Sequence, residues 1–113
     1  MGDPNPTATV TVHDGVARVD VGGYISDTGA EVLAPAVAAA AAEARIVVAF
    51  AVGSMINSAG IAVLLDLLLP LRDTGIDIRI VHPSAHFRRV FAIVGLAAWV
   101  PVYESLDSAL AAP

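Results

Sequence analysis

Ser58 is the side chain whose position in this sequence best suits regulated chemistry. It lies in the segment Ile56-Asn57-Ser58-Ala59-Gly60, between an apolar run at 46–50 and a second apolar stretch that begins at Ile61. The first run has the composition of a strand buried on both faces, and the second reads as a helix. This spacing places Ser58 at or next to a helix N-terminus. Free backbone N–H groups and the positive end of the helix dipole favour an anion there, such as a phosphate carried on the hydroxyl.

Two other interpretations of Ser58 come from the residues alone. An ordinary N-cap serine would occupy the same place in a strand-turn-helix unit. A hydrolase nucleophile in a G-x-S-x-G elbow would need glycine at position 56, where Ile56 stands, and 113 residues are too few for the usual hydrolase scaffold. The second hydroxyl of the loop, Ser54, reads as a turn residue.

The three histidines do not form a recognisable catalytic or metal-binding set. His82 and His86 are four residues apart, but Pro83 between them places one at a strand end and the other in a helix. His13 lies in a separate segment. We therefore expect histidines in loops or on the surface, no enzyme activity, no metal site and no cofactor.

Composition excludes several classes of protein. The chain has a net charge of −5, and its six basic residues are all arginine. Only Arg88 and Arg89 are adjacent, whereas a nucleic-acid-binding surface needs a dense basic face, so no nucleic-acid partner is expected. The absence of cysteine rules out disulfides and fits a reducing compartment. A hydrophobic content of 57% is ample for the core of one domain.

The termini and apolar runs predict a cytoplasmic protein. Residues Met1 to Pro6 are polar and proline-containing, with no signal-peptide pattern, and are expected to form a flexible tail before a domain at 7–113. The most apolar run, Ile61 to Leu71, contains Asp66 and Pro70 and is about half the length of a membrane-spanning helix. We expect it to be a core helix, with no membrane insertion.

The N-terminal half contains two strand patterns and a helix pattern. Alternating residues at 7–13 and 16–21 flank Asp14-Gly15, a hairpin turn signal, and predict an antiparallel pair. Thr28 and Glu31 have the spacing of a capping box, which predicts a helix from about Gly29 to Glu43. Pro35 inside that helix predicts a kink or a later start.

The C-terminal half alternates helix and strand patterns. A strand is expected at 76–81, with Asp77 and Arg79 on one face, and Pro70 is expected to kink or shorten the helix before it. Ser84 is the predicted N-cap of a helix that ends at Gly95. A short strand at 100–102 and a last helix from Ser105 to about Ala111 complete the chain. Trp99 and Tyr103, which flank the short strand, are expected in the core. The order β-β-α-β-α-β-α-β-α predicts a mixed, mostly parallel sheet of about four to five strands covered by about four helices.

Several segments in this order resemble the STAS domain family, and within it the bacterial anti-sigma-factor antagonists. The resemblance covers nearly the whole chain, from about Val10 to Ala111. Each segment alone is a weak signal, but the order and spacing are specific. The segments are Arg45-Ile46-Val47-Val48, Ile56 to Leu64, Ile80-Val81-His82-Pro83-Ser84, Val94-Gly95-Leu96 and Pro101 to Leu110.

The resemblance implies a regulatory switch. In this family a serine at the start of the second helix is phosphorylated by an anti-sigma factor that is also a kinase of the GHKL type, and a PP2C-type phosphatase reverses the reaction. The unphosphorylated antagonist binds the anti-sigma factor and thereby frees the sigma factor. Ser58 matches the phosphorylated serine.

The resemblance also implies a partner-binding surface at the start of the second helix. That surface would combine residues 53–61 with the loop at 23–27. Phosphorylation adds about −1.5 to −2 charge, which an interface of about 800 Å² per partner would have to desolvate, at a hundredfold or greater loss of affinity. The expected partner-binding residues are Tyr24, Ser26, Asp27, Gly53, Ser54, Met55, Ile56, Asn57, Ser58, Ala59, Gly60 and Ile61.

Three positions depart from the family pattern. Asn57 replaces the usual aspartate before the phosphorylated serine, Ala59 replaces a common serine or threonine, and Ala49 stands where many members carry aspartate. Asparagine caps helices well, and its neutral side chain does not repel a neighbouring phosphate. Two functions therefore remain open: a phosphorylation-switched antagonist, and a STAS scaffold or accessory subunit of a signalling or transport assembly that binds a partner constitutively.

Overall fold

A five-stranded mixed sheet forms the centre of the protein in the computed structural model, which describes residues 5–113. The strand order is β1-β2-β4-β6-β7, and only β1 runs antiparallel to its neighbour. A second, two-stranded sheet pairs β3 with β5 in parallel. The strands are β1 (Thr7–His13), β2 (Val16–Gly22), β3 (Tyr24–Ile25), β4 (Arg45–Phe50), β5 (Met55–Ile56), β6 (Asp77–Val81) and β7 (Val102–Tyr103).

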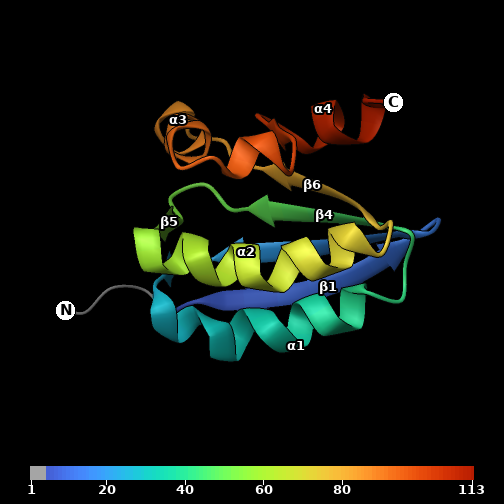
Figure 1. The fold of residues 1–113 in the computed structure, drawn as a ribbon, viewed down its shortest axis with the longest axis horizontal. Helices are drawn as coiled ribbons and strands as arrows, with labels where there is room; N and C mark the ends of the chain where they lie inside the picture. Colours follow the sequence, from blue (N-terminus) through green and yellow to red (C-terminus); the bar gives the residue numbers. More distant parts are fainter. Residues whose placement is uncertain (1–4) are drawn as a thin grey trace.

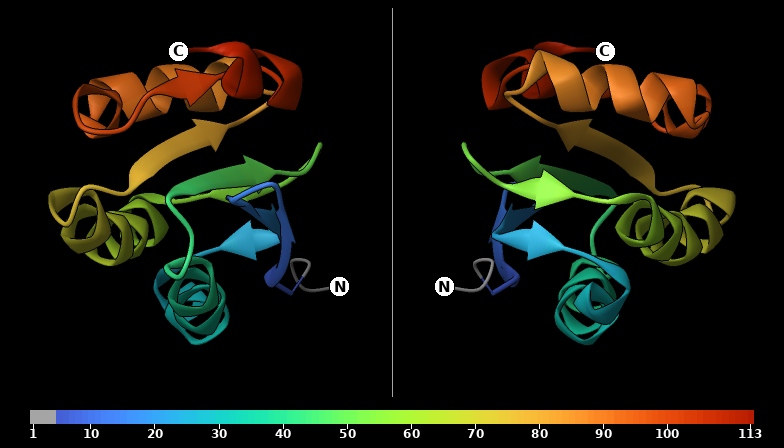
Figure 2. Two further views of the ribbon diagram at one scale, coloured as in Figure 1. Left: turned by 90° about the vertical axis from the view of Figure 1, so that its right-hand side faces the viewer. Right: turned by 90° about the vertical axis from the view of Figure 1, so that its left-hand side faces the viewer.

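Helices cover both sides of the main sheet. Figures 1 and 2 show α1 and α2 side by side below the sheet, and α3 and α4 on the opposite side. The α-helices are α1 (Ala30–Ala40), α2 (Ser58–Asp73), α3 (Ala85–Ile93) and α4 (Leu106–Ala111), and the short 3-10 helices are η1 (Asp27–Gly29) and η2 (Leu96–Ala98). The predicted fold class, a mixed and mostly parallel sheet covered by four helices, is confirmed.

Strand β4 is buried on both faces, as its composition predicted. Ile46, Val48 and Phe50 point into the larger core cluster, which includes residues of α1 and α2. Val47 and Ala49 point the other way, into a smaller cluster with residues of β6 and α4. This alternation follows from the period of two in a strand. Packing on both faces fixes the position of β4, and the loop at its end leads directly to the start of α2.

The beginning of α1 differs from the sequence prediction. The prediction of a capping box formed by Thr28 and Glu31 is wrong, because the N-cap residue is Gly29 and no side chain caps the helix. The Thr28 hydroxyl instead lies 3.0 Å from the hydroxyl of Ser26. The helix starts at Ala30 with Pro35 in its interior, so the later start is also wrong.

Other element boundaries shift by a few residues. Helix α1 ends at Ala40 rather than near 43, and α2 continues through Pro70 to Asp73, so the proline does not shorten it. The last strand, β7, spans Val102–Tyr103 rather than 100–102, and Val100 is a buried residue that precedes it. The two-residue strands β3 and β5 and both 3-10 helices were not predicted. Of the tail expected at 1–6, residues 1–4 lie outside the described residues.

The predicted caps of the C-terminal helices are confirmed. The Ser84 hydroxyl accepts a hydrogen bond from the Phe87 N–H, and the Ser105 hydroxyl accepts one from the Ser108 N–H at 3.1 Å. Gly95 follows α3 with a φ of 87°, a left-handed conformation that glycine adopts without strain.

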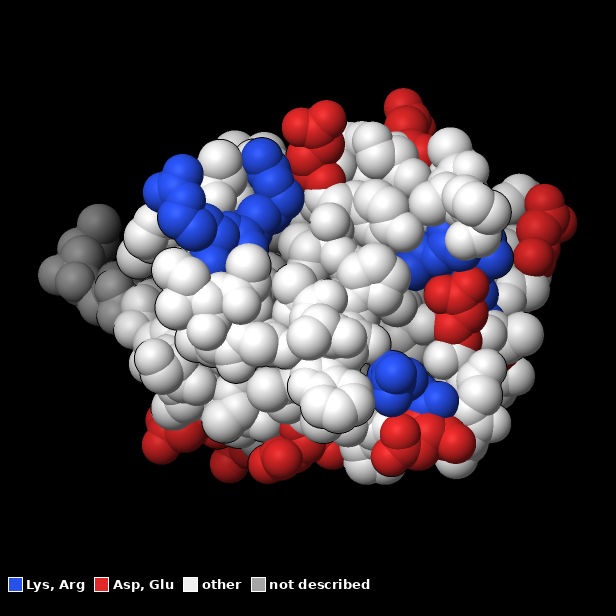
Figure 3. Space-filling view, turned by 45° about the horizontal axis from the view of Figure 1, so that its top comes forward, with Lys and Arg blue, Asp and Glu red and all other residues white. Residues whose placement is uncertain are grey.

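Charged side chains are spread over the surface. On the face drawn in Figure 3, basic groups are separated from one another by uncharged surface, and acidic side chains lie along the edges and against the basic groups on the right. Within residues 5–113, no helix is long and apolar enough to cross a membrane.

Two aromatic residues lie where the sequence did not predict them. His82, expected in a loop or on the surface, is only 1% exposed, whereas Trp99, expected in the core, is 54% exposed. The His82 ring packs between aromatic rings, 5.1 Å from that of Phe50 and 4.8 Å from that of Phe87. Its Nδ1 accepts a hydrogen bond from the Ser84 N–H, while its Nε2 is buried without a partner. His82 is therefore held neutral inside the core.

We expect stability to fall in mild acid because of His82. Burial, and secondarily the nearby positive charge of Arg88, lowers the pKa of His82 from 6.5 to about 4. Below pH 6.5 the unfolded chain binds a proton at this position that the folded protein excludes until about pH 4. The free energy of unfolding should therefore drop by about 3 kcal/mol between pH 7.5 and pH 4 from this residue.

Urea unfolding at a series of pH values measures this effect. The matched variant His82→Asn keeps an acceptor for the Ser84 N–H but cannot titrate, so its stability should decline less steeply over the same range. Parallel pH profiles for the two proteins would contradict the assignment.

Candidate functional site

Ser58 is the first residue of α2 and is exposed. The preceding residue, Asn57, is the N-cap, with extended backbone and its Oδ1 accepting a hydrogen bond from the Gly60 N–H at 2.8 Å. The predicted position of Ser58 at a helix N-terminus is thus confirmed. Asn57 performs the capping, so the Ser58 hydroxyl is not required for it.

The two segments expected to share one surface lie together. Strands β3 and β5 pair in parallel, with Tyr24 opposite Met55 and Ile25 opposite Ile56. The Met55 N–H also donates to the Gly23 carbonyl at 3.0 Å, and the Asn57 N–H donates to the Ile25 carbonyl at 3.1 Å. This small sheet fixes the β2–α1 loop beside the β4–α2 loop.

A side-chain contact continues the link between these loops. The Nδ2 of Asn57 donates a hydrogen bond to the Tyr24 hydroxyl at 3.3 Å. The Asn57 amide is therefore held at both ends, by the helix backbone through its oxygen and by Tyr24 through its nitrogen. Neither the pairing of β3 with β5 nor this contact has a sequence signal, because two-residue strands are too short to show a pattern.

Gly60 allows α2 to approach β3 closely. A Cβ at this position would lie 2.5 Å from the Ile25 carbonyl oxygen and 2.9 Å from the side chain of Ile56. Any larger residue would push the first turn of α2 away from β3. The glycine thus sets the position of the helix end that carries Ser58.

Burial divides the expected partner-binding residues into two groups. Four of them are buried and hold the loops in place, and Ser54 among them is a turn residue whose hydroxyl donates to the Ala51 carbonyl at 2.7 Å. The buried four are Ser54, Ile56, Gly60 and Ile61. The exposed or half-buried remainder are Tyr24, Ser26, Asp27, Gly53, Met55, Asn57, Ser58 and Ala59.

An exposed apolar residue not predicted for the site adds to this surface. Val52, in the turn between β4 and β5, is 89% exposed, and Met55 is 51% exposed. Apolar side chains this open to solvent can serve as contacts for a binding partner. The sequence could have suggested that Val52 is exposed, because it lies in the loop that follows the buried apolar run at 46–50.

The charge at the start of α2 suits an anion. The first turn of α2 contains no acidic residue, so no carboxylate of the helix itself offsets the positive end of the helix dipole. Among the described residues, no group of three or more histidine, cysteine or acidic side chains could hold a metal ion. The helix end beside Ser58 would therefore favour a negatively charged group.

Replacing Asn57 should separate its capping role from the effect of a negative charge at this position. We expect Asn57→Ala to lower the free energy of unfolding by about 1 kcal/mol, because the Gly60 N–H loses its acceptor. Asn57→Asp keeps that acceptor and places a negative charge at the helix N-terminus, so its stability should stay within about 0.5 kcal/mol of wild type or rise. Urea unfolding at pH 7 tests both, and equal losses for the two variants would contradict the capping role.

Comparison with known proteins identifies the family to which this fold belongs. A sequence model of the STAS domain family matches residues 7–109. The fold is similar to that of an anti-sigma factor antagonist from Mycobacterium paratuberculosis, with a TM-score of 0.81 and 28% identity over 94% of this chain and 92% of that one. No curated protein matches the chain.

The fold is also similar to that of the Bacillus cell fate determinant SpoIIAA. The phosphorylated form of SpoIIAA has a TM-score of 0.66 at 19% identity, over 92% of this chain and 96% of SpoIIAA. The unphosphorylated form has a TM-score of 0.68 at 17% identity, over 92% and 93% of the two chains. From its sequence match and its fold, the protein belongs to the STAS domain family.

Proposed function

We propose that this protein is an anti-sigma-factor antagonist, a cytoplasmic binding module rather than an enzyme, and that phosphorylation of Ser58 switches its partner binding off. The observation that carries the proposal is the exposed Ser58 hydroxyl on the first turn of α2, where Asn57 already caps the helix. The hydroxyl is therefore available to a kinase without loss of the cap. A phosphate on it would face a helix end that carries no acidic residue.

The proposed partner is an anti-sigma factor of the GHKL kinase type, with a PP2C-type phosphatase to reverse the modification. It would bind the exposed residues of the loops around Ser58, with Val52 and Met55 as apolar contacts. The structural similarity to an anti-sigma factor antagonist supports this class of partner. SpoIIAA, which has a similar fold, exists in phosphorylated and unphosphorylated forms.

A second function is favoured by the residues beside Ser58. Asn57 and Ala59 depart from the family pattern, and a kinase that recognises a carboxylate before the serine would not find one here. A STAS scaffold that binds its partner constitutively, within a signalling or transport assembly, is consistent with this difference.

Phosphorylation of the purified protein distinguishes the two functions. The protein is incubated with ATP and the GHKL-type kinase encoded nearest to its gene, and the intact mass is measured. We expect wild type to gain one phosphate and Ser58→Ala to gain none, while Ser108→Ala, altered at an exposed serine of α4, behaves as wild type. A kinase that binds the protein without phosphorylating it would favour the scaffold.

A further inference from the structure

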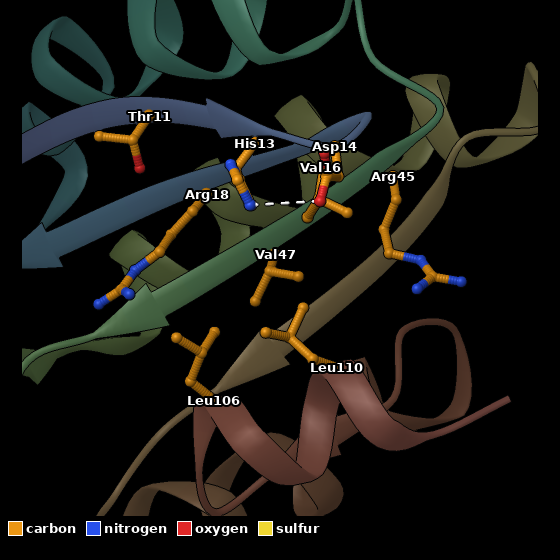
Figure 4. A pocket seen from close by; sticks show the side chains of 9 residues that line it. All are labelled: Thr11, His13, Asp14, Val16, Arg18, Arg45, Val47, Leu106 and Leu110. Atoms are coloured by element: carbon orange, nitrogen blue, oxygen red, sulfur yellow. Dashed lines mark ion pairs between the residues drawn. The ribbon is translucent and has the colours of Figure 1, made fainter.

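A groove of about 440 Å³ lies on the side of the sheet that faces α4 (Figure 4). Its floor is the surface of β1, β2 and β4, and one wall is α4. Parallel strands are normally covered on both faces. Here α4 spans six residues and packs mainly on β6 and β7, which leaves the neighbouring surface of β1 and β2 open.

Strand register explains which side chains form the floor. Thr11 pairs with Arg18, and Arg18 pairs with Val47, which gives one row across the three strands. His13, Val16 and Arg45 form the adjacent row in the same way. Residues two apart on a strand share a face, so both rows point into the groove.

The middle of the groove is apolar. Val47 forms its base, and Leu106 and Leu110 project from α4 toward it (Figure 4). Leu110 is 44% exposed, so this apolar surface is open to solvent. Arg18 and Arg45 lie on either side of these three residues (Figure 4).

Both arginines retain free hydrogen-bond donors. Arg18 donates through Nε to Asp20 at 2.9 Å, and Arg45 donates through Nε to Asp77 at 3.1 Å. Among the described residues, the terminal Nη atoms of these two arginines have no hydrogen-bond partner. Arg79 differs, since all three of its guanidinium nitrogens are bonded. The free Nη groups can bind a carboxylate or sulfonate.

The rim of the groove also carries a histidine beside a carboxylate. His13 Nε2 lies 3.2 Å from the Asp14 carboxylate, and both side chains are about nine-tenths exposed. The groove thus has an arginine on each side, each paired through Nε with a carboxylate, and one further carboxylate at its rim. Recognition of an anion would therefore depend on the free Nη donors of the two arginines, not on a net positive charge.

We propose that this groove binds a small organic anion with an apolar body. The carboxylate or sulfonate would accept hydrogen bonds from the Nη groups of Arg18 or Arg45, and the apolar body would lie on Val47 between Leu106 and Leu110. The volume is in the range of small-molecule sites, roughly 300–1,000 Å³. Asp14 at the rim would disfavour an anionic group at that end.

The groove is separate from the Ser58 surface. Val16 and Arg45 are the first residues of β2 and β4, whereas Ser58 follows the other end of β4. Figure 1 shows α4 and the start of α2 toward opposite ends of the molecule. Ligand binding at the groove therefore does not depend on the proposed phosphorylation, and either can fail without the other.

Titration with matched probes, followed by two-dimensional amide NMR, tests the proposal. Decanoate supplies the anion and the apolar body, decyltrimethylammonium has the same body with the opposite charge, and inorganic sulfate has the charge without the body. We expect saturable shifts at the amides of Thr11, Val16, Val47 and Leu110 with decanoate. Decyltrimethylammonium and sulfate should bind at least tenfold more weakly.

Variants of exposed or half-buried groove residues locate the binding site. The double variant Arg18→Gln, Arg45→Gln should weaken decanoate binding about fivefold or more, and the two single variants show which arginine meets the carboxylate. Leu110→Glu should weaken binding more than Leu110→Gln, which removes the same apolar side chain without adding charge. Arg89→Gln on α3 is the control and should bind as wild type. Thermal unfolding confirms that each variant is folded.

Three results would overturn the proposal. The first is no saturable shift with decanoate below its micelle concentration. The second is equal binding of the cationic probe, which would show that the arginines do not select an anion. The third is a set of shifts centred away from the groove, for example on the exposed apolar residues Val52 and Met55.

Discussion

Ser58→Glu is expected to lower affinity for the anti-sigma factor by at least a hundredfold. The substitution puts a permanent negative charge at the centre of the exposed surface formed by the β2–α1 and β4–α2 loops. A partner that covers this surface must desolvate the charge, which costs several kcal/mol unless an opposite charge meets it. A hundredfold loss corresponds to about 2.7 kcal/mol.

Ser58→Glu should leave the fold intact. Asn57 retains the N-cap bond to Gly60, and a carboxylate in the first turn of α2 interacts favourably with the helix dipole. Stability should therefore be unchanged or slightly higher while binding is lost. Ser58→Ala, which adds no charge, should bind within a fewfold of wild type.

A matched control is available on α4. Ser108 is exposed and lies three residues after the N-cap Ser105, so Ser108→Glu places the same charge near a helix N-terminus on another part of the surface. Calorimetric titration of each variant with the anti-sigma factor gives the affinities. Equal binding by Ser58→Glu and Ser108→Glu would contradict a switch at Ser58.

The sheet and its helices could be predicted because the signals are local. The run at 46–50 is apolar on both faces, Asp14-Gly15 marks the hairpin, and Ser84 and Ser105 mark two helix starts. These features depend on residues close together in sequence. The fold class and the position of Ser58 follow from them.

The failed predictions concern residues whose surroundings come from distant parts of the chain. His82 is buried because Phe50 and two α3 side chains enclose it, which a count of local polarity does not show. Trp99 follows η2 and is exposed, and its ring packs against a residue far away in the sequence. The Arg72 guanidinium lies 5.3 Å from the centre of that ring. The pairing of β3 with β5 likewise depends on segments about thirty residues apart.

Arg79 is a further residue whose environment could not be inferred locally. The strand pattern placed Asp77 and Arg79 on one face, which is confirmed, but it did not show that Arg79 is only 2% exposed. Arg79 donates two hydrogen bonds to the Asp77 carboxylate, at 3.2 and 3.0 Å. Its remaining donors reach the carbonyls of Ala109, Ala112 and Pro113 at the end of α4. One side chain thus provides donors for a carbonyl in the last turn of α4 and for two carbonyls that follow the helix.

Arg79→Ala should lower the free energy of unfolding by about 2–3 kcal/mol. It removes the buried partner of the half-exposed Asp77 carboxylate, and it leaves the carbonyl of the buried residue Ala109 without this donor. For a domain whose total stability is roughly 5–15 kcal/mol, this is a large fraction. Arg79→Lys keeps the charge but cannot reproduce the planar fork, so its loss should be intermediate. Arg89→Ala, at an exposed position of α3, is the control and should stay within about 0.5 kcal/mol of wild type.

The pH dependence distinguishes the ion pair from simple loss of packing. Hydrogen bonding from Arg79 holds the pKa of Asp77 below its usual value, although partial burial opposes this shift. The pair therefore stabilises the fold above the unfolded pKa of about 3.8, and this contribution disappears as the pH falls through the lower, folded pKa. In urea unfolding, the difference between wild type and Arg79→Ala should narrow below pH 4. A constant difference down to pH 2.5 would show that the packing of the arginine and its hydrogen bonds to carbonyls, rather than its pairing with Asp77, hold α4 on the sheet.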